Sequence, residues 1–317
     1  MKITEADKKR VKAMGCLFNR ESEDEFNVRV ITENGTLTGV QLANIAEAAD
    51  RFGSGTVAFT TRLTVEISGV KYEDIPALQA HLARANLETG GTGAKVRPVT
   101  ACKGTTCVFG QINTQAIAKQ IHKRFYEGYK DVALPHKFKI AVGGCPNNCM
   151  KPDLNDFGLI GQNKPLVNWD KCRGCKKCIV QEGCQRGAAK VVDGKITIDK
   201  DRCNACGKCI RNCYFKSLSS QAHGVKIVIG GRWGREGRKA SELPGIYSAI
   251  DAMDILEKTL LAYRHYGRPR ERFGLMVERL GMDRMEELLL TDEVLRKKEQ
   301  ILAEPVGAGA DLQPGRA

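Results

Sequence analysis

The spacing of hydrophobic and polar residues predicts an α+β unit in the first part of the chain. Alternation with a period of two indicates strands, and a period near 3.6 indicates helices. In chain order, the expected elements are a strand at 26–32, a helix at 39–52, a strand at 57–67 and a helix at 74–86. Each strand carries an arginine, Arg29 or Arg62, on the face opposite its hydrophobic residues. This β-α-β-α order is typical of an α+β fold.

The pattern resumes after a glycine-rich stretch at 89–94, which we interpret as a hinge. The expected elements are a helix at 111–128, strands at 137–142 and 225–230, and helices at 243–264 and 282–303. In the first of these strands, Lys137 and Lys139 share one face and Phe138 lies on the other. Two cations therefore project together from one strand.

Length and composition limit the kind of protein. A chain of 317 residues that is 42% hydrophobic can bury two or three domains. No apolar run is long enough to cross a bilayer, and the charged N-terminus does not resemble a secretory signal. We therefore expect a cytoplasmic protein with no membrane span. The net charge of +13 indicates an anionic partner, such as nucleic acid, a membrane surface, an acidic protein or a polyanionic cofactor.

The chain contains 13 cysteines, and their grouping is the most informative feature of the sequence. Cytoplasmic thiols stay reduced, so clustered cysteines indicate metal binding and not a disulfide framework. All except Cys16 fall into short-spaced sets of four. We expect Cys16 to be a small buried hydrophobic residue.

Eight of these cysteines form an internal repeat between residues 163 and 220. They are Cys172, Cys175, Cys178 and Cys184, then Cys203, Cys206, Cys209 and Cys213. Three cysteines separated by pairs of residues can wrap one [4Fe–4S] cube, with the fourth ligand coming from the other half of the repeat. This crossed arrangement joins Cys213 to the first three cysteines, and Cys184 to Cys203, Cys206 and Cys209.

The repeat resembles a two-cluster ferredoxin. It differs from the usual form in having five residues before Cys184 and no proline after Cys184 or Cys213. Two zinc sites are the alternative interpretation, because CxxC pairs also bind zinc. The segment carries 13 Lys and Arg against 5 Asp and Glu, which favours an acidic partner protein.

The remaining four cysteines occur in TACKGTTC and GGCPNNC, as Cys102-x4-Cys107 and Cys145-x3-Cys149. These segments resemble the sirohaem-[4Fe–4S] site of the nitrite and sulfite reductase family, and among its branches they are most like the small catalytic subunit of anaerobic sulfite reductase. The family's usual first pair has five intervening residues, whereas this chain has four. The resemblance implies that all four cysteines hold a cube and that Cys149 also binds the sirohaem iron.

The same resemblance assigns roles to basic residues from separate segments. It implies that the substrate anion is bound by Arg29, Arg97, Lys137 and Lys139, and that Arg62 contacts sirohaem. Arg232, Arg235 and Arg238, in a Gly/Arg loop, either bind sirohaem carboxylates or form a basic surface loop. Each residue alone would be interpreted as a solvated charge. Their joint match favours the functional interpretation, since sulfite and sirohaem are both anionic.

Together these features predict a sulfite/nitrite reductase-type half with an inserted ferredoxin. The expected parts are a ferredoxin-like unit at 1–90, a catalytic domain at 91–162 and 221–304, a 2[4Fe–4S] ferredoxin domain at 163–220 and a disordered tail at 305–317.

The predicted function is the six-electron reduction of sulfite to sulfide, using sirohaem and three [4Fe–4S] clusters. No GxGxxG motif is evident, so we expect an outside electron donor: an acidic ferredoxin, or flavin and ferredoxin-type partner subunits. The chain would complete its pocket alone, by self-association or with partner subunits. The alternatives are nitrite reduction to ammonia, a polyferredoxin electron carrier, and a nucleic-acid-binding iron–sulfur protein. The last is least favoured because only 6% of residues are aromatic and no stacking motif stands out.

Overall fold

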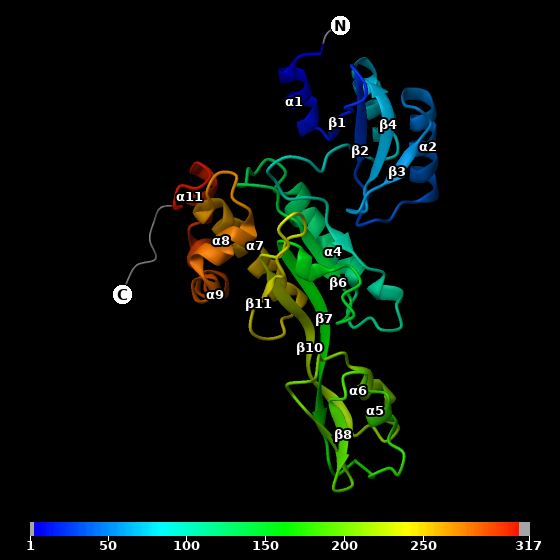
Figure 1. Cartoon of the computed structure of the whole chain (residues 1–317), viewed down its shortest axis with the longest axis vertical. Helices are drawn as coiled ribbons and strands as arrows, with labels where there is room; N and C mark the ends of the chain where they lie inside the picture. Colours follow the sequence, from blue (N-terminus) through cyan, green and yellow to red (C-terminus); the bar gives the residue numbers. More distant parts are fainter. Residues whose placement is uncertain (1–2, 311–317) are drawn as a thin grey trace.

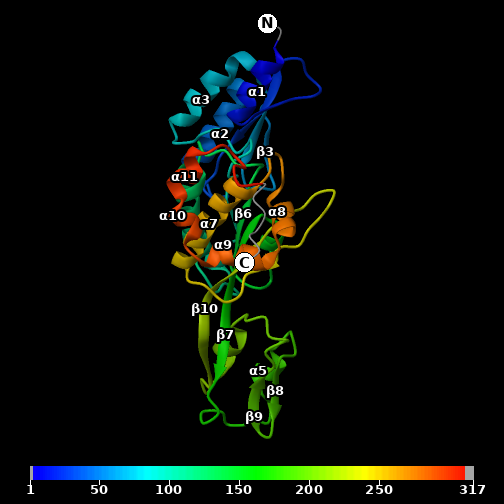
Figure 2. The ribbon, with the colours of Figure 1, turned by 90° about the vertical axis from the view of Figure 1, so that its left-hand side faces the viewer.

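The computed structural model describes residues 3–310, which form an elongated molecule (Figure 1). Within these residues there are three separate hydrophobic cores. The N-terminal unit lies at one end, the cysteine-rich unit lies at the other, and the largest core lies between them (Figure 2). None of the described helices is long and apolar enough to span a membrane.

The N-terminal unit is an antiparallel sheet with helices packed against it. Its strand order is β1-β2-β4-β3. The strands are β1 (Cys16–Phe18), β2 (Glu25–Val30), β3 (Val57–Phe59) and β4 (Val65–Lys71), and the helices are α1 (Glu5–Ala13), α2 (Gly39–Phe52) and α3 (Ile75–Ala83). The predicted faces of β2 are confirmed, because Phe26, Val28 and Val30 are fully buried. The predicted helix at 39–52 is also confirmed, and Thr38 and Gln41 cap it reciprocally.

The prediction of one long strand at 57–67 was wrong, because these residues form a hairpin. Strands β3 and β4 pair antiparallel, and the Thr60 N–H donates to the Thr64 carbonyl at 2.9 Å across the turn. Leu63 adopts a left-handed backbone with φ 58°, which reverses the chain. Phe59, which lies on the hydrophobic face of the predicted strand, is 76% exposed. The turn places Arg62 at the hairpin tip, from which it reaches the unit with the largest core. We refer to that unit as the catalytic unit, after the prediction made from its sequence.

The catalytic unit is a mixed sheet of order β11-β10-β7-β6-β5. The strands are β5 (Thr100–Ala101), β6 (Ile140–Gly143), β7 (Phe157–Val167), β10 (Leu218–Ile229) and β11 (Ser241–Glu242). Strands β5, β6 and β7 run parallel, and β10 is antiparallel to β7. Phe138 and Ile140 are fully buried whereas Lys137 and Lys139 are not, which confirms the two predicted faces.

The helices of this unit are shorter than predicted. They are α4 (Thr114–Ile121), α7 (Ala249–Tyr266), α8 (Phe273–Leu280), α9 (Met282–Leu290), α10 (Glu293–Arg296) and α11 (Lys298–Ala303). The expected helix at 111–128 ends in a π-helical turn at His122–Glu127. The helix expected from residue 243 begins after Ser248, because the Ser248 side chain caps it together with Asp251. The helix expected at 282–303 is divided into three, and α8 was not predicted.

The cysteine-rich unit is carried on a two-stranded arm. Strands β7 and β10 stay paired from Phe157 and Ile229 out to Val167 and Leu218. Beyond the arm lie α5 (Ile179–Glu182), the hairpin β8 (Ala189–Val192) and β9 (Lys195–Ile198), and α6 (Lys208–Asn212). The unit is thus inserted between two paired strands of the catalytic sheet, at the lower end in Figure 1.

Part of the predicted disordered tail is ordered. Residues 305–310 form turns in which the Gly307 N–H donates to the Arg264 carbonyl at 2.8 Å and the Gly309 N–H donates to the His265 carbonyl at 2.9 Å. These carbonyls belong to the last turn of α7 and have no partner within that helix. The rest of the predicted tail, 311–317, lies outside the described residues.

Candidate redox centres and anion site

The first cysteine set lies at the carboxyl edge of the parallel strands. Cys102 directly follows β5 and Cys145 closely follows β6, so the parallel pairing of these strands brings both to one edge. The Gly144 N–H donates to the Cys102 sulfur at 3.1 Å. A Cβ on Gly104 would lie 2.8 Å from the Gly144 Cα, so the two loops touch backbone to backbone. The glycines in KGTTC and VGGC therefore allow the two cysteine loops to meet.

The four sulfurs of this set influence one another. Burial raises the pKa of Cys145, and Cys102, Cys107 and Cys149 raise it further, while the Asn147 N–H opposes the rise. Across the described part of the chain, no three Cys, His, Asp or Glu side chains are close enough to hold a single metal ion. A [4Fe–4S] cube spreads its thiolates over four irons, whereas zinc gathers them around one ion. That this set holds a cube stays a prediction.

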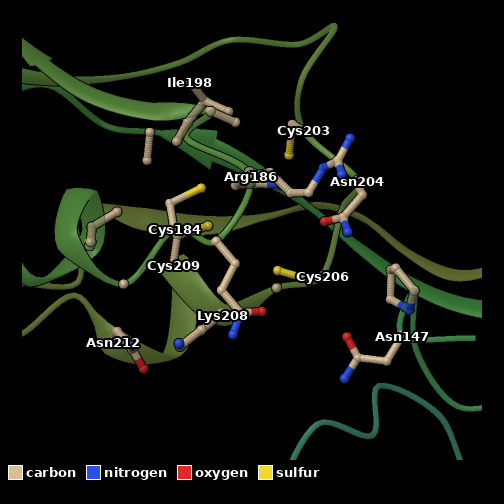
Figure 3. A pocket seen from close by; sticks show the side chains of 18 residues that line it. Asn147, Cys184, Arg186, Ile198, Cys203, Asn204, Cys206, Lys208, Cys209 and Asn212 are labelled. Carbon is tan, nitrogen blue, oxygen red and sulfur yellow. The ribbon is translucent and has the colours of Figure 1, made fainter. Parts of the chain in front are cut away.

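One crossed cysteine set of the inserted unit shares a cavity. Cys184 lines the same cavity of about 260 Å³ as Cys203, Cys206 and Cys209 (Figure 3). Burial by itself raises the pKa of Cys184, but backbone N–H groups of residues 186–189 outweigh it and lower the pKa. Such N–H groups favour a thiolate, which is the form that binds iron.

The cavity also touches the catalytic unit. Pro146 and Asn147, from the loop between Cys145 and Cys149, line it together with the four cysteines. The Arg211 guanidinium donates to the Val108 carbonyl at 2.9 Å, which holds α6 against the loop that follows Cys107. This cysteine set and the first set are therefore neighbours.

The other crossed set lies in the small core of the inserted unit. Cys213 belongs to that core, and Cys172 and Cys178 pack against it, whereas Cys175 is exposed. Burial alone would raise the pKa of the Cys213 thiol, but hydrogen bonds from the hydroxyl and backbone N–H of Ser217 lower it. The Ile196 N–H donates to the Cys172 sulfur at 3.4 Å.

The predicted cations of the N-terminal and catalytic units gather between those two units. Arg29 and Arg97 both donate to the Gly91 carbonyl. Arg29 also pairs with Glu66, at 2.9 Å from Nε to the carboxylate. Arg62 donates to the Asn155 side chain at 2.7 Å and to the Ile140 carbonyl at 3.0 Å.

The charges in this cation cluster are closely coupled. Burial lowers the pKa of Arg62 to about 10, and the nearby charges of Arg97 and Arg29 contribute to the decrease. The Asp156 carboxylate acts in the opposite direction. Burial, then Arg62 and Lys137, lower the pKa of Lys139 to about 8. Like charges held together and partly shielded from water favour binding of an anion.

Sequence reasoning missed three residues of this cluster. Arg272 donates to the fully buried Asp156 carboxylate, at 3.0 and 3.1 Å, and Asp156 accepts the Lys139 N–H. His136 lies beside them, and burial, then Arg272 and Lys137, lower its pKa. No local pattern marks Arg272, because its partner is 116 residues away.

The Gly/Arg loop lies beside the segment that leaves Cys149. Gly231 packs against the carbonyls of Asp153 and Asn155. Arg232 is paired with Glu236, and Arg238 donates to Glu278 and to the Gly230 carbonyl. Arg235 is exposed. Two of the three predicted arginines therefore already have partners within the chain.

The cation cluster and the first cysteine set are not brought together. Arg97, Lys137 and Lys139 precede β5 and β6, whereas Cys102 and Cys145 follow them. The four residues of β6 alone separate the two groups by roughly 13 Å. Asn155 links the two groups indirectly. Its side chain accepts a hydrogen bond from Arg62 of the cation cluster and donates one, at 2.9 Å, to the carbonyl of Lys151, which closely follows Cys149.

The fold and the cysteine sets are those of an iron–sulfur oxidoreductase. Comparison with known families agrees. "Nitrite/Sulfite reductase ferredoxin-like half domain" matches residues 19–85, and "Nitrite and sulphite reductase 4Fe-4S domain" matches residues 92–298. The chain therefore belongs to the nitrite and sulfite reductase family, whose members use sirohaem and iron–sulfur clusters.

Several relatives are similar over much of the chain. The coenzyme F420-dependent sulfite reductase of Methanocaldococcus jannaschii is 30% identical over 83% of this chain, which spans 42% of that protein. An uncharacterized protein of the same organism is 30% identical over 87% of this chain and 96% of its own length. One subunit of the anaerobic sulfite reductase of Salmonella typhimurium is 28% identical over 54% of this chain and 53% of its own length. A ferredoxin–nitrite reductase of Leptolyngbya laminosa is 29% identical over 48% of this chain, which spans 31% of that protein.

Solved structures share the fold. Dissimilatory sulfite reductase I superposes with a TM-score of 0.69 over 89% of this chain and 72% of its own, at 22% identity. The NirA protein of Mycobacterium tuberculosis superposes with a TM-score of 0.64 over 99% of this chain and 50% of its own, at 16% identity. The architecture is therefore that of a sulfite/nitrite reductase.

Proposed function

We propose that this protein reduces sulfite to sulfide at a sirohaem coupled to the cluster of Cys102, Cys107, Cys145 and Cys149. When bound, sirohaem and its cluster would supply the electrons and the iron that holds the anion. The main support is the cation cluster, in which Arg29, Arg97, Lys137 and Lys139 converge from separate segments. Such a pocket suits a small oxyanion.

The residues of the pocket suggest a division of labour. Arg29 and Arg97, both oriented by the Gly91 carbonyl, would bind and orient the oxyanion. Lys139, with a pKa of about 8, holds a proton on Nζ at neutral pH and is able to donate it as oxygen leaves as water. We assign the exposed Arg235 to sirohaem carboxylates, whereas Arg62, like Arg232 and Arg238, already donates to groups of this chain and would have to exchange them for sirohaem.

The inserted unit would relay electrons through its two clusters in a fixed order. The cavity lined by Cys184 and Cys206 also touches Asn147 of the catalytic loop, so we assign the cluster there as the exit. The exposed Cys175 marks the other cluster as the entry. An acidic donor protein would dock at the entry, because the unit is rich in Lys and Arg. With the catalytic cluster, this makes three [4Fe–4S] clusters.

We further propose that a second chain completes the pocket. The cation cluster and the cysteine loops of one chain lie at opposite ends of β6. The cations of one chain would therefore face the cysteine loops of another copy or of a partner subunit. Mixing inactive Lys139→Ala and Cys149→Ala variants tests this idea. Restored sulfite reduction in the mixture supports a shared pocket between copies, and no restoration speaks against it.

Nitrite reduction is the second candidate, because a ferredoxin–nitrite reductase is 29% identical over 158 residues. Sulfite is favoured because a sulfite reductase matches over 268 residues, a much longer part of the chain. Steady-state kinetics with both anions separates the two. A higher kcat/KM for nitrite would overturn the assignment.

The visible spectrum and iron content of anaerobically purified protein test the proposal as a whole. We expect tetrapyrrole bands together with iron for three cubes and one sirohaem. Only broad iron–sulfur absorption after sirohaem loading would indicate an electron carrier and refute the enzymatic assignment.

A further inference from the structure

Asp156 is a buried carboxylate at the centre of the cation cluster. It lies just before β7 and has no exposed surface. One oxygen accepts the Lys139 backbone N–H at 2.8 Å, and Arg272 Nη2 donates to both oxygens, at 3.0 and 3.1 Å. Burial raises the pKa of this carboxyl group, and Arg272 and the Lys139 N–H oppose the rise, so these donors favour its ionised form. Its position is therefore defined by the start of β6 and the start of α8.

These contacts hold Lys139 from two sides. Its N–H is bound by Asp156, and its carbonyl accepts the Phe157 N–H at 3.0 Å. The peptide groups on both sides of the Lys139 Cα are thus fixed, which leaves the side chain as the part free to move. Arg272 is the N-cap residue of α8, so this bond network joins three elements of the catalytic unit.

The charges around Lys139 are mostly positive. Arg62 approaches from the β3–β4 hairpin, Lys137 from the same segment before β6, and Arg272 from the N-terminus of α8. Arg97 and His136 lie beyond them, next to Lys137 or Arg272. Repulsion among these groups favours the neutral amine, which would bind an anion poorly.

We propose that Asp156 is a positioning residue for the anion site: clamped by Arg272, its carboxylate fixes the backbone of Lys139 and supplies negative charge that keeps this lysine cationic. The role of Lys139 in sulfite binding rests on the proposed function above. The effect of Asp156 on Lys139 does not depend on it.

The electrostatic effects on Lys139 agree with this role. Burial, then Arg62, Lys137 and Arg272, lower its pKa to about 8, and Asp156 acts in the opposite direction. Loss of the Asp156 charge should therefore lower the pKa of Lys139, and loss of the Arg272 charge should raise it. Asp156 and Arg272 are hydrogen-bonded to each other, so opposite shifts in the pKa of Lys139 when each is replaced would be specific to this electrostatic role.

Pulse acetylation of the intact protein with acetic anhydride measures this signature, because only neutral amines react. The extent of Lys139 labelling across roughly pH 6 to 10, read by mass spectrometry, gives its titration midpoint. We expect Asp156→Asn to increase labelling near neutral pH about threefold to tenfold, and Arg272→Gln to decrease it by a similar factor.

Glu66→Gln is the matched control. It removes a carboxylate that pairs with Arg29 in the same cation cluster but does not contact Lys139, so the Lys139 midpoint should not move. General loosening of the pocket would instead raise the midpoint in both test variants, towards that of an exposed lysine. That result, or an unchanged midpoint in Asp156→Asn, would overturn the proposal.

The test also remains decisive if one variant is unstable. Should Asp156→Asn fail to fold, Asp156→Ser replaces it, because serine also removes the negative charge and keeps a polar group at this position. The Lys139 midpoint should then fall as well, and a midpoint that stays or rises contradicts the proposal. Labelling needs neither sirohaem nor turnover. A protein that proves inactive with sulfite can therefore still confirm or refute the role of Asp156.

Discussion

The inserted unit and the catalytic unit hold their cysteines in different ways. In the inserted unit, Cys213 is part of a small core otherwise made of Val180, Ala189, Ile196 and Leu218, and half-buried cysteines pack around it. In the catalytic unit, a large core reaches from Val96 to Ile301 and contains no cysteine. The cysteine loops there lie at the edge of the sheet. We therefore expect the inserted unit to depend on its proposed clusters for folding, whereas the large core of the catalytic unit needs no cluster to form.

Iron removal should give the largest difference between the two units. We expect anaerobic chelation to abolish amide-exchange protection in α5, α6, β8 and β9, because their core depends on bound clusters. Strand β6 and helix α7 should stay protected. Hydrogen exchange read by mass spectrometry measures both regions in one sample. Persistent protection of the inserted unit in the iron-free protein would show that this unit does not need iron to fold.

Single cysteine substitutions sharpen the same contrast at the level of activity. Cys149→Ala should reduce sulfite reduction at least about 100-fold with any electron donor, because it removes a ligand of the reacting centre. Cys206→Ala should cause a similar loss with a protein donor but much less with a small chemical reductant that bypasses the relay. The ratio of the two activities is the measurement. Equal losses with both reductants would argue against a relay through the inserted unit.

The pH dependence of sulfite binding tests the cation cluster. A lysine is charged below its pKa and neutral above it, and the pKa of Lys139 is lowered to about 8 by burial, Arg62 and Lys137. Sulfite affinity should therefore fall by up to about tenfold per pH unit above this value. Lys139→Arg should remove the decline, because arginine stays charged. Titrations of sulfite at several pH values measure it, and an unchanged decline in the variant would exclude Lys139 as its cause.

The smallest effect is expected at Cys16. It is fully buried in the N-terminal core, as predicted, and burial raises its pKa to about 11. Cys16→Ala should lower the free energy of unfolding by about 1 kcal/mol and leave the iron content unchanged. Chemical denaturation and an iron assay measure the two quantities. Loss of iron in this variant would mean that a thirteenth cysteine takes part in cluster binding.

Much of the local structure was predictable from sequence because it depends on near neighbours. Helix α2 and the faces of β2 follow directly from hydrophobic periodicity. The hairpin at 57–67 was missed because its strands continue one alternating pattern through a turn closed by Thr60 and Thr64. Helix α8 was missed because it is short and its burial depends on contacts with the rest of the catalytic core.

Ligand type and spacing are local properties of the chain, so the cysteines that are candidates for binding iron could be proposed from sequence alone. The basic residues Arg29, Arg97, Lys137 and Lys139 were proposed from the resemblance to the family, because each of them alone looks like an ordinary solvated charge. How these parts meet depends on the three-dimensional fold. The parallel strands place cations and cysteines at opposite ends of β6, and the arm of β7 and β10 places the cavity of Cys184 beside Asn147. Asp156 and Arg272 meet across 116 residues because sheet topology and packing, unlike periodicity, act between residues far apart in the chain.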